Sequence, residues 1–291
     1  MRQDDPRTER VDSAGLSLRV HVWEGHGEPP PGAPRTLLLL HGYLDCGGTF
    51  APLVRELPPW LRVLAPDMRG HGESGRIDRS TWYHFSDYVR DVRAVVDALG
   101  EGSLAVLGHS MGGGISVLFA GTYAEEVVRL VLVEGLGPPE EDLSDGPARM
   151  ARWVKELADG PRGSRPFSSY DDVASRLARQ NPRVTPERAA ELAGWLAEEV
   201  EGEVRYRHDV WHRARTPQLY RPARYTPFLE AISCPVLTVT GGRSWYKWPD
   251  LEARRARLAT RRHVHFEDCG HMVHYEVPSL LAGEIAGFLE S

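Results

Sequence analysis

The chain has 291 residues, a formal net charge of −6, 41% hydrophobic and 26% charged residues, which is typical of a globular protein with a large core. The acidic balance argues against a nucleic-acid partner, because phosphate binding needs clustered Lys and Arg. Three cysteines without a CxxC pair predict neither a disulfide framework nor a zinc site, and we expect no metal or cofactor. A polar N-terminus and the absence of a long apolar run predict a cytoplasmic protein without membrane contact. No feature indicates an oligomeric state.

Short apolar runs alternate with segments of helical spacing along the chain. After two β-like runs within residues 11–24, the expected buried strands are residues 36–40, 62–65, 103–107, 127–133, 236–240 and 263–266. The expected helices are residues 86–99, 112–123, 249–259 and 279–289. Strands that alternate with helices predict an α/β fold, with a mostly parallel sheet covered by helices on both faces.

One stretch interrupts this alternation. Residues 138–229 lack a buried-strand pattern and contain helix-like segments at 148–157, 170–179 and 186–199, the last with Thr185 as its N-cap. We therefore expect a helical cap at 138–229 inserted between two parts of one core domain, residues 1–137 and 230–291.

The strongest chemical signal is Gly-His-Ser-Met-Gly at residues 108–112, which directly follows a predicted strand and precedes a predicted helix. This is the Gly-x-Ser-x-Gly pattern in the context that it requires. The glycines allow a tight strand-to-helix turn, and the helix N-terminus favours developing negative charge. Ser110 is therefore the predicted nucleophile.

A second loop, His41-Gly42-Tyr43-Leu44, follows the strand at 36–40. Such a loop can direct the backbone N–H of Tyr43 at a substrate carbonyl oxygen, and the N–H of Met111 would complete an oxyanion hole. The side chains expected to contact the substrate are those of Tyr43, Leu44, His109 and Trp245.

A histidine after the last predicted strand supplies the general base. His271 follows Gly270, which lets the backbone turn toward the nucleophile. His274 remains the alternative base. His263 and His265 are two residues apart on a predicted strand, and without an acidic or Cys partner we interpret them as structural.

Several of these motifs together resemble the α/β-hydrolase superfamily. They are His-Gly at 41–42, Asp-Met-Arg-Gly-His-Gly-Glu-Ser at 67–74, Gly-His-Ser-Met-Gly-Gly at 108–113 and Gly-His at 270–271. The resemblance covers nearly the whole chain outside the cap, and it implies architectural roles for Asp67, Arg69 and His71. Residues 134–139 and 206–209 are similar to the serine-hydrolase-like branch. We expect His208 and Asp209 to tie cap helices together, with pocket lining as the alternative.

The acid of the catalytic triad departs from the usual pattern. In most of the superfamily an Asp follows the strand assigned here to 236–240, whereas this chain has Ser244 there, which cannot carry the charge. Haloalkane dehalogenases place the acid after the next strand beyond the nucleophile, and Glu134 lies there, 24 residues after Ser110. A carboxylate that ends an apolar strand needs a partner, and His271 would supply it. Asp250 and Asp268 remain alternatives.

A serine nucleophile argues against a dehalogenase or an epoxide hydrolase, which need a nucleophilic carboxylate. We predict a carboxylesterase that forms an acyl-enzyme on Ser110 and acts on a small to medium apolar ester. C–C bond, lactone or amide hydrolysis and perhydrolysis by the same triad remain open, as does a non-catalytic ligand-binding protein. The expectation of an apolar substrate rests on the aromatic residues in and after the cap: Trp153, Tyr170, Trp195, Tyr206, Trp211, Tyr220, Tyr225, Trp245, Tyr246 and Trp248.

Overall fold

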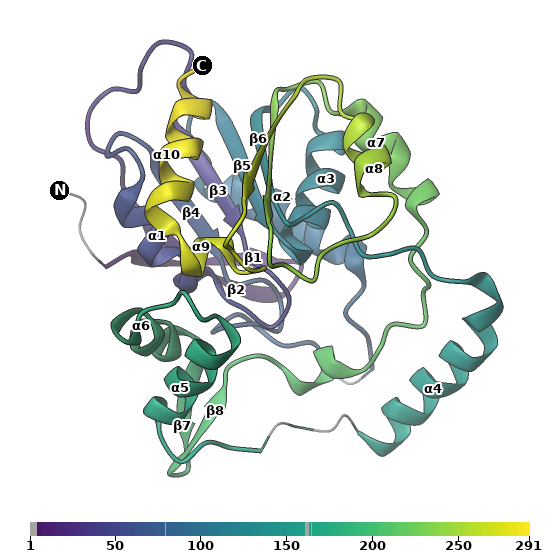
Figure 1. The fold of residues 1–291 in the computed structure, drawn as a ribbon. Helices are drawn as coiled ribbons and strands as arrows, with labels where there is room; N and C mark the ends of the chain where they lie inside the picture. Colours follow the sequence, from purple (N-terminus) through teal and green to yellow (C-terminus); the bar gives the residue numbers. More distant parts are fainter. Residues whose placement is uncertain (1–4, 79, 161–162, 164) are drawn as a thin grey trace.

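The computed structural model describes residues 5–78, 80–160, 163 and 165–291. Its centre is an eight-stranded sheet with the strand order β1-β2-β4-β3-β5-β6-β9-β10 (Figure 1). Only the β1–β2 and β2–β4 pairs are antiparallel, and every other pair in this sheet is parallel. The predicted α/β fold is therefore confirmed. The strands are β1 Arg7–Ser13, β2 Leu16–Trp23, β3 Thr36–Leu40, β4 Arg62–Pro66, β5 Leu104–His109, β6 Val127–Val133, β9 Val236–Gly241 and β10 Arg261–Phe266.

Helices cover both faces of the sheet, because successive side chains of its central strands point to opposite faces and are apolar on both. In β3, Leu38 and Leu40 pack into one core cluster, whereas Leu37 and Leu39 pack into the other. The first cluster includes side chains from α2 Phe85–Leu99, α3 Met111–Thr122, α7 Thr226–Ala231 and α8 Leu251–Ala256. The second includes side chains from α1 Ala51–Glu56, α9 Val273–Glu276 and α10 Pro278–Leu289. Among the described helices, none combines the length and apolar character needed to cross a lipid bilayer.

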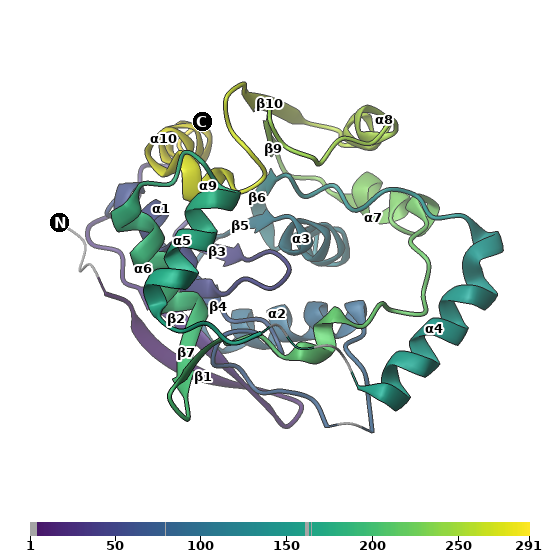
Figure 2. The same ribbon diagram turned by 60° about the horizontal axis from the view of Figure 1, so that its bottom comes forward.

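Most of the chain between β6 and β9 lies outside these layers. The helices α5 Tyr170–Gln180 and α6 Pro186–Leu196 and the hairpin β7 Ala197–Val200 with β8 Glu203–Tyr206 share a third, smaller core cluster, which also includes Cys46 and Tyr275 from outside the segment. Figures 1 and 2 both show α4 Gly146–Asp159 apart from that group, and none of its residues is buried. Short 3-10 turns complete the segment: η2 Leu143–Asp145, η3 Val210–Arg213 and η4 Pro222–Arg224. A further 3-10 turn, η1 Gly47–Phe50, precedes α1 in the core.

Within this insertion, one predicted helix end is wrong. The helix expected at 186–199 ends at Leu196, because the next residues pair as an antiparallel hairpin around Glu201 and Gly202. Both turn residues have positive φ, 54° and 79°, which a tight hairpin turn uses. The start of that helix is confirmed, since the Thr185 hydroxyl accepts a hydrogen bond from the Arg188 N–H at 3.3 Å.

Candidate active site

The turn that carries Ser110 joins β5 directly to α3. Ser110 has φ 53° and ψ −113°, a strained conformation for a residue with a side chain. A Cβ atom on Gly108 would lie 2.3 Å from the Gly112 carbonyl oxygen, and a Cβ on Gly112 would lie 2.0 Å from the Leu40 carbonyl oxygen. Only glycine fits at both positions, so these residues force the serine into its exposed turn.

Three of the predicted site residues form one hydrogen-bond chain. The Ser110 hydroxyl donates to His271 Nε2 at 3.0 Å, and His271 Nδ1 donates to Glu134 Oε2 at 3.1 Å. The Glu134 side chain is fully buried, and that of His271 is 11% exposed. The ends of β5 and β6 and the loop after β10 thus bring together a hydroxyl, an imidazole and a carboxylate in the order that nucleophilic catalysis requires.

Glu134 is held at the end of β6 by three further hydrogen bonds. It has a positive φ of 52°, and its N–H donates to the Val239 carbonyl at 2.9 Å. Its Oε1 accepts from the Gly241 N–H at 2.7 Å, and its Oε2 accepts from the Ser244 hydroxyl. These donors satisfy a buried carboxylate. Ser244, at the position where the superfamily usually has the acid, instead orients the acid that β6 supplies.

The alternative acids and the alternative base have other partners. Asp250 pairs with Arg254 at 2.6 Å, and Asp268 pairs with Arg243 at 2.7 Å. His274 is buried, and its Nε2 lies 3.5 Å from Asp45 Oδ2. No hydrogen bond within the described residues joins any of these three to Ser110 or His271.

The two predicted oxyanion donors lie on either side of the nucleophile. Met111 is the first residue of α3, so its N–H has no partner within the helix. The loop with Tyr43 also approaches the nucleophile, since a Cβ on Gly42 would lie 3.3 Å from the Ser110 Cβ. This loop is fixed by two hydrogen bonds: the Tyr43 hydroxyl donates to the His212 carbonyl at 2.7 Å, and the Leu44 N–H donates to His71 Nε2 at 3.3 Å.

Residues 67–74 hold the loop after β3 in place through hydrogen bonds. Asp67 accepts hydrogen bonds from the backbone N–H groups of Gly47 and Glu73, both at 2.8 Å. Arg69 donates two hydrogen bonds of 2.6 Å to the buried carboxylate of Asp91. These contacts hold backbone segments together, and neither side chain lines a cavity at the nucleophile.

The prediction that His109 contacts substrate is wrong. Its side chain is 1% exposed and lines neither cavity near the nucleophile, because the last residue of β5 points into the protein. Its Nε2 donates to the backbone carbonyl of His271 at 3.0 Å, and burial lowers its pKa well below the usual range, which favours the neutral imidazole. His109 therefore supports the loop of the base.

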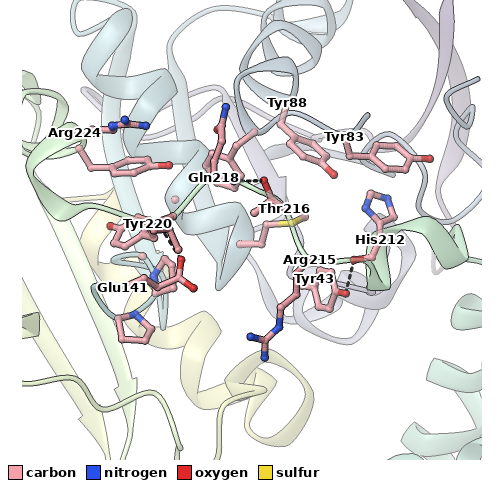
Figure 3. Close-up of a pocket in the computed structure, with 18 of the residues that line it drawn as sticks. Tyr43, Tyr83, Tyr88, Glu141, His212, Arg215, Thr216, Gln218, Tyr220 and Arg224 are labelled. Atoms are coloured by element: carbon pink, nitrogen blue, oxygen red, sulfur yellow. Dashed lines mark hydrogen bonds between the residues drawn. The ribbon is translucent and has the colours of Figure 1, made fainter. Parts of the chain in front are cut away.

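Two cavities meet at Tyr43 and Arg213, which line both of them. The first has a volume of about 500 Å³, includes Met111 in its wall, and is shown in Figure 3. Its aromatic wall consists of Tyr43, Trp82, Tyr83, Phe85, Tyr88, Tyr220 and Tyr225. The second has a volume of about 660 Å³ and is lined by His271 and by the predicted contact residues Leu44 and Trp245.

Of the cap pair His208 and Asp209, only the first lines a cavity, the second one. Asp209 accepts a hydrogen bond from the Tyr83 hydroxyl at 2.7 Å, and its N–H donates to the Gly70 carbonyl at 2.7 Å. Asp209 thus ties the insertion to the core, a contact that lies away from the nucleophile.

One group in the described chain has the spacing of metal ligands, although no sequence motif indicated it. Donor atoms of Asp45, His109 and His274 lie within 4.8 Å of one another, all buried. Asp45 Oδ2, His109 Nδ1 and both ring nitrogens of His274 lack a hydrogen-bond partner. Since His109 Nε2 donates to a carbonyl, Nδ1 of its neutral imidazole carries a lone pair. These residues are far apart in sequence, so no local motif marks them.

Comparison with known proteins places this geometry in a family. The family profile described as "alpha/beta hydrolase fold" matches residues 35–278. A "Serine hydrolase-like protein" of Danio rerio is 34% identical over 191 residues, which cover 64% of this chain and 56% of that relative. A "Serine hydrolase-like protein" of Dictyostelium discoideum is 25% identical over 295 residues, which cover 94% of this chain and 79% of the relative.

Solved structures agree in fold over almost the whole chain. The thioesterase domain from the curacin biosynthetic pathway superposes with a TM-score of 0.83 at 24% identity, and it covers 97% of this chain and 99% of its own. A hypothetical protein of Pseudomonas aeruginosa PAO1 gives 0.81 at 27% identity, with 97% and 98% covered. Because the family profile spans most of the sequence and these folds superpose end to end, the chain belongs to the α/β-hydrolase fold family.

Proposed function

We propose that this protein is a serine hydrolase that cleaves carboxylic esters through an acyl-enzyme on Ser110. The hydrogen-bond chain from the Ser110 hydroxyl through His271 to Glu134 carries the proposal. The buried Glu134 fixes the tautomer of His271 and stabilises the imidazolium that forms when the serine proton is removed. The relatives named serine hydrolase-like, and the neighbour titled an esterase from Mycobacterium tuberculosis, are consistent with it.

The reaction follows from this arrangement. His271 Nε2 takes the Ser110 proton as the oxygen attacks the ester carbonyl, and the backbone N–H groups of Tyr43 and Met111 stabilise the oxyanion. His271 then gives the proton to the leaving alcohol. A water molecule, deprotonated by His271, attacks the acyl-enzyme and releases the acid.

We further propose that residues 138–229 act as a cap that shapes the substrate site over a core of residues 1–137 and 230–291. Tyr220 and Tyr225 lie in this segment and line the first cavity, which supports a substrate with an apolar part of modest size. The alternative hypothesis, a non-catalytic binding protein, is based on the absence of an Asp at position 244. The hydrogen bond between His271 and Glu134 favours the hydrolase instead, because Glu134 supplies the carboxylate.

Hydrolysis of 4-nitrophenyl acetate, butyrate and octanoate tests the proposal. The wild type should turn over at least one ester, and Ser110→Ala should lose at least about 10⁴-fold in kcat, because the nucleophile is gone. Ser86→Ala, on the exposed part of α2, is the matched control and should behave as wild type. A wild type that is inert on all three esters, or a Ser110→Ala variant as active as wild type, would overturn the ester hydrolase.

A further inference from the structure

The two cavities offer a substrate different surroundings. The first is walled mainly by aromatic side chains, and Figure 3 shows Tyr43, Tyr83, Tyr88 and Tyr220 around it. Four arginines from separate segments line the second cavity, although the whole chain has a net charge of −6: Arg176, Arg183, Arg213 and Arg243. The first cavity is also lined by four arginines, Arg149, Arg213, Arg215 and Arg224, so that Arg213 belongs to both.

The carboxylates in the same wall already have partners. Asp268 pairs with Arg243 at 2.7 Å. Glu276 is 7% exposed and accepts a hydrogen bond from the Gly270 N–H at 3.0 Å. Asp45 is 4% exposed and accepts from the Tyr275 hydroxyl at 2.8 Å. These acids therefore leave the other three arginines of the wall without a counter-charge.

Those three arginines are exposed, and the guanidinium of Arg176 lies over the Phe167 ring, 5.9 Å from its centroid. Within the described chain, no carboxylate lies at ion-pair distance from Arg176, Arg183 or Arg213. Burial raises the pKa of the half-buried Tyr206 in the same wall, and the nearby charges of Arg176 and Arg213 oppose that rise. Both guanidinium groups thus act on the cavity surface. Several cations without counter-ions around a cleft attract anions.

The catalytic geometry decides which part of an ester enters each cavity. His271 must protonate the leaving oxygen, so the leaving group lies on the His271 side of Ser110. His271 lines the second cavity, the proposed oxyanion donor Met111 lines the first, and the other proposed donor, Tyr43, lies between them and lines both. The leaving group therefore belongs in the second cavity and the acyl group in the first.

We propose that the natural substrate is an ester of an apolar acid whose leaving group carries an anion, a carboxylate or a phosphate. Arg176, Arg183 and Arg213 bind that anion in the second cavity, while the aromatic wall of the first cavity holds the acyl group. This inference rests on the proposed ester hydrolysis, and it adds a charge requirement on one side of the scissile bond. Guanidinium groups suit this task because they donate several hydrogen bonds to one anion.

The alternative to this proposal is that arginines of the first cavity bind the anion. Arg149 pairs with Glu141 there. Figure 3 shows Arg215 pointing away from Tyr83 and Tyr88. Arg224, also labelled there, lines this cavity too, and Arg213 lines both cavities. If these first-cavity arginines bound the anion instead, the preferred substrate would carry its charge on the acyl group.

Three butyrate-sized esters separate these possibilities. They are 4-nitrophenyl butyrate, which is neutral, 5-butyryloxy-2-nitrobenzoate, with a carboxylate on the leaving group, and mono-4-nitrophenyl glutarate, with a carboxylate on the acyl group. Each kcat/KM is divided by the second-order rate constant for hydroxide attack on the same ester, which removes differences in leaving-group reactivity and leaves out intramolecular attack by the glutarate carboxylate on its own ester. The leaving-group anion should be preferred over the neutral ester by about tenfold, the value of one charge-assisted hydrogen bond.

Variants and salt test the source of that preference. Arg183→Gln and Arg213→Gln should each lower the ratio of anionic to neutral ester several-fold, and 0.5 M NaCl should lower it in the wild type because exposed charges are screened. Arg90→Gln, an exposed arginine on α2, is the matched control and should keep the wild-type ratio.

Two results would overturn the inference while leaving ester hydrolysis intact: a ratio at or below one with normal turnover of the neutral ester, or a preference for the glutarate. A wild-type ratio that survives both arginine substitutions would also overturn it, because the anion would then bind elsewhere. If the wild type hydrolyses none of the three esters, the proposed function and this inference fall together.

Discussion

The catalytic side of the site and its binding side are built in different ways. Ser110 and Glu134 both have positive φ, and glycine backbones packed against other backbone atoms hold the surrounding turns. The three arginines proposed to bind the anion are exposed side chains, one on α5, one after it and one on η3. The chemistry therefore depends on backbone geometry that tolerates little change. The proposed anion preference depends on side chains that can be replaced without disturbing the turns around Ser110 and Glu134.

Apart from the loss of Ser110 itself, substitution of Glu134, the proposed acid, should have the largest effect on kcat. Glu134→Gln keeps the shape but removes the charge that stabilises the His271 imidazolium, so kcat should fall about 10³- to 10⁴-fold. Asp250→Asn should retain activity, because Asp250 pairs with Arg254 and makes no hydrogen bond to His271. Steady-state kinetics with one 4-nitrophenyl ester measures both variants. The opposite ranking would make Asp250 the acid.

A glycine pair tests whether the catalytic side is the less tolerant one. A Cβ on Gly113 would lie 2.4 Å from the Gly135 Cα, backbone against backbone, whereas a Cβ on Gly194 in α6 meets nothing within 4 Å. Gly113→Ala should lower the free energy of unfolding by about 3 kcal/mol, the upper range for overpacking. Gly194→Ala should raise it by about 0.5–1 kcal/mol, because alanine favours the helix. Urea unfolding at pH 7 measures both, and equal shifts would refute the contrast.

The sequence alone predicted that Ser110, His271 and Glu134 lie together, because the constraints on these positions leave local marks. Glycines around Ser110 signal a crowded turn, and the carboxylate of Glu134 at the end of an apolar strand signals a buried partner. The structure brings both residues to His271, as expected. Ser244 could not be assigned a role from sequence, because its contact with Glu134 joins two strands that are 110 residues apart.

The binding side could not be predicted in the same way. Arg176, Arg183 and Arg213 belong to no common motif, and their shared cavity arises only from the folding of α5 and η3 over the core. His109 was misassigned because a residue next to the nucleophile in sequence can point to the opposite side of a strand. The hairpin of β7 and β8 was missed because its four-residue strands lack the apolar run of a buried strand.

We expect a lower pH to weaken first the contact that His212 makes between the insertion and the core. Burial lowers the pKa of His212 to about 4, with His41 and His208 adding to the effect and Asp209 opposing it. Between pH 4 and about 6.5, the unfolded state binds more protons than the folded state, so stability falls as the pH falls through this window. From pH 7 to pH 5, His212 alone should cost about 2 kcal/mol of unfolding free energy.

The measurement is urea unfolding of the wild type and His212→Gln at both pH values. The glutamine side chain can still donate a hydrogen bond, as His212 Nε2 does to the Arg69 carbonyl at 3.2 Å, but it does not titrate. The variant should therefore show a smaller loss of stability on acidification. An unchanged difference between the two pH values would assign the acid sensitivity to other groups.

Tyr43→Phe has the smallest expected effect. It tests the hydrogen bond that joins the loop after β3 to the segment with His212. The Tyr43 hydroxyl donates to the His212 carbonyl at 2.7 Å, so its loss should lower the free energy of unfolding by about 1 kcal/mol. The proposed oxyanion donor is the backbone N–H, which phenylalanine keeps, and kcat should therefore stay within about threefold of wild type. Urea unfolding and ester kinetics on the same preparation separate the two effects. A loss of kcat far beyond threefold, with stability unchanged, would mean that the phenol itself contacts the reacting atoms and that the oxyanion is not stabilised by the backbone alone.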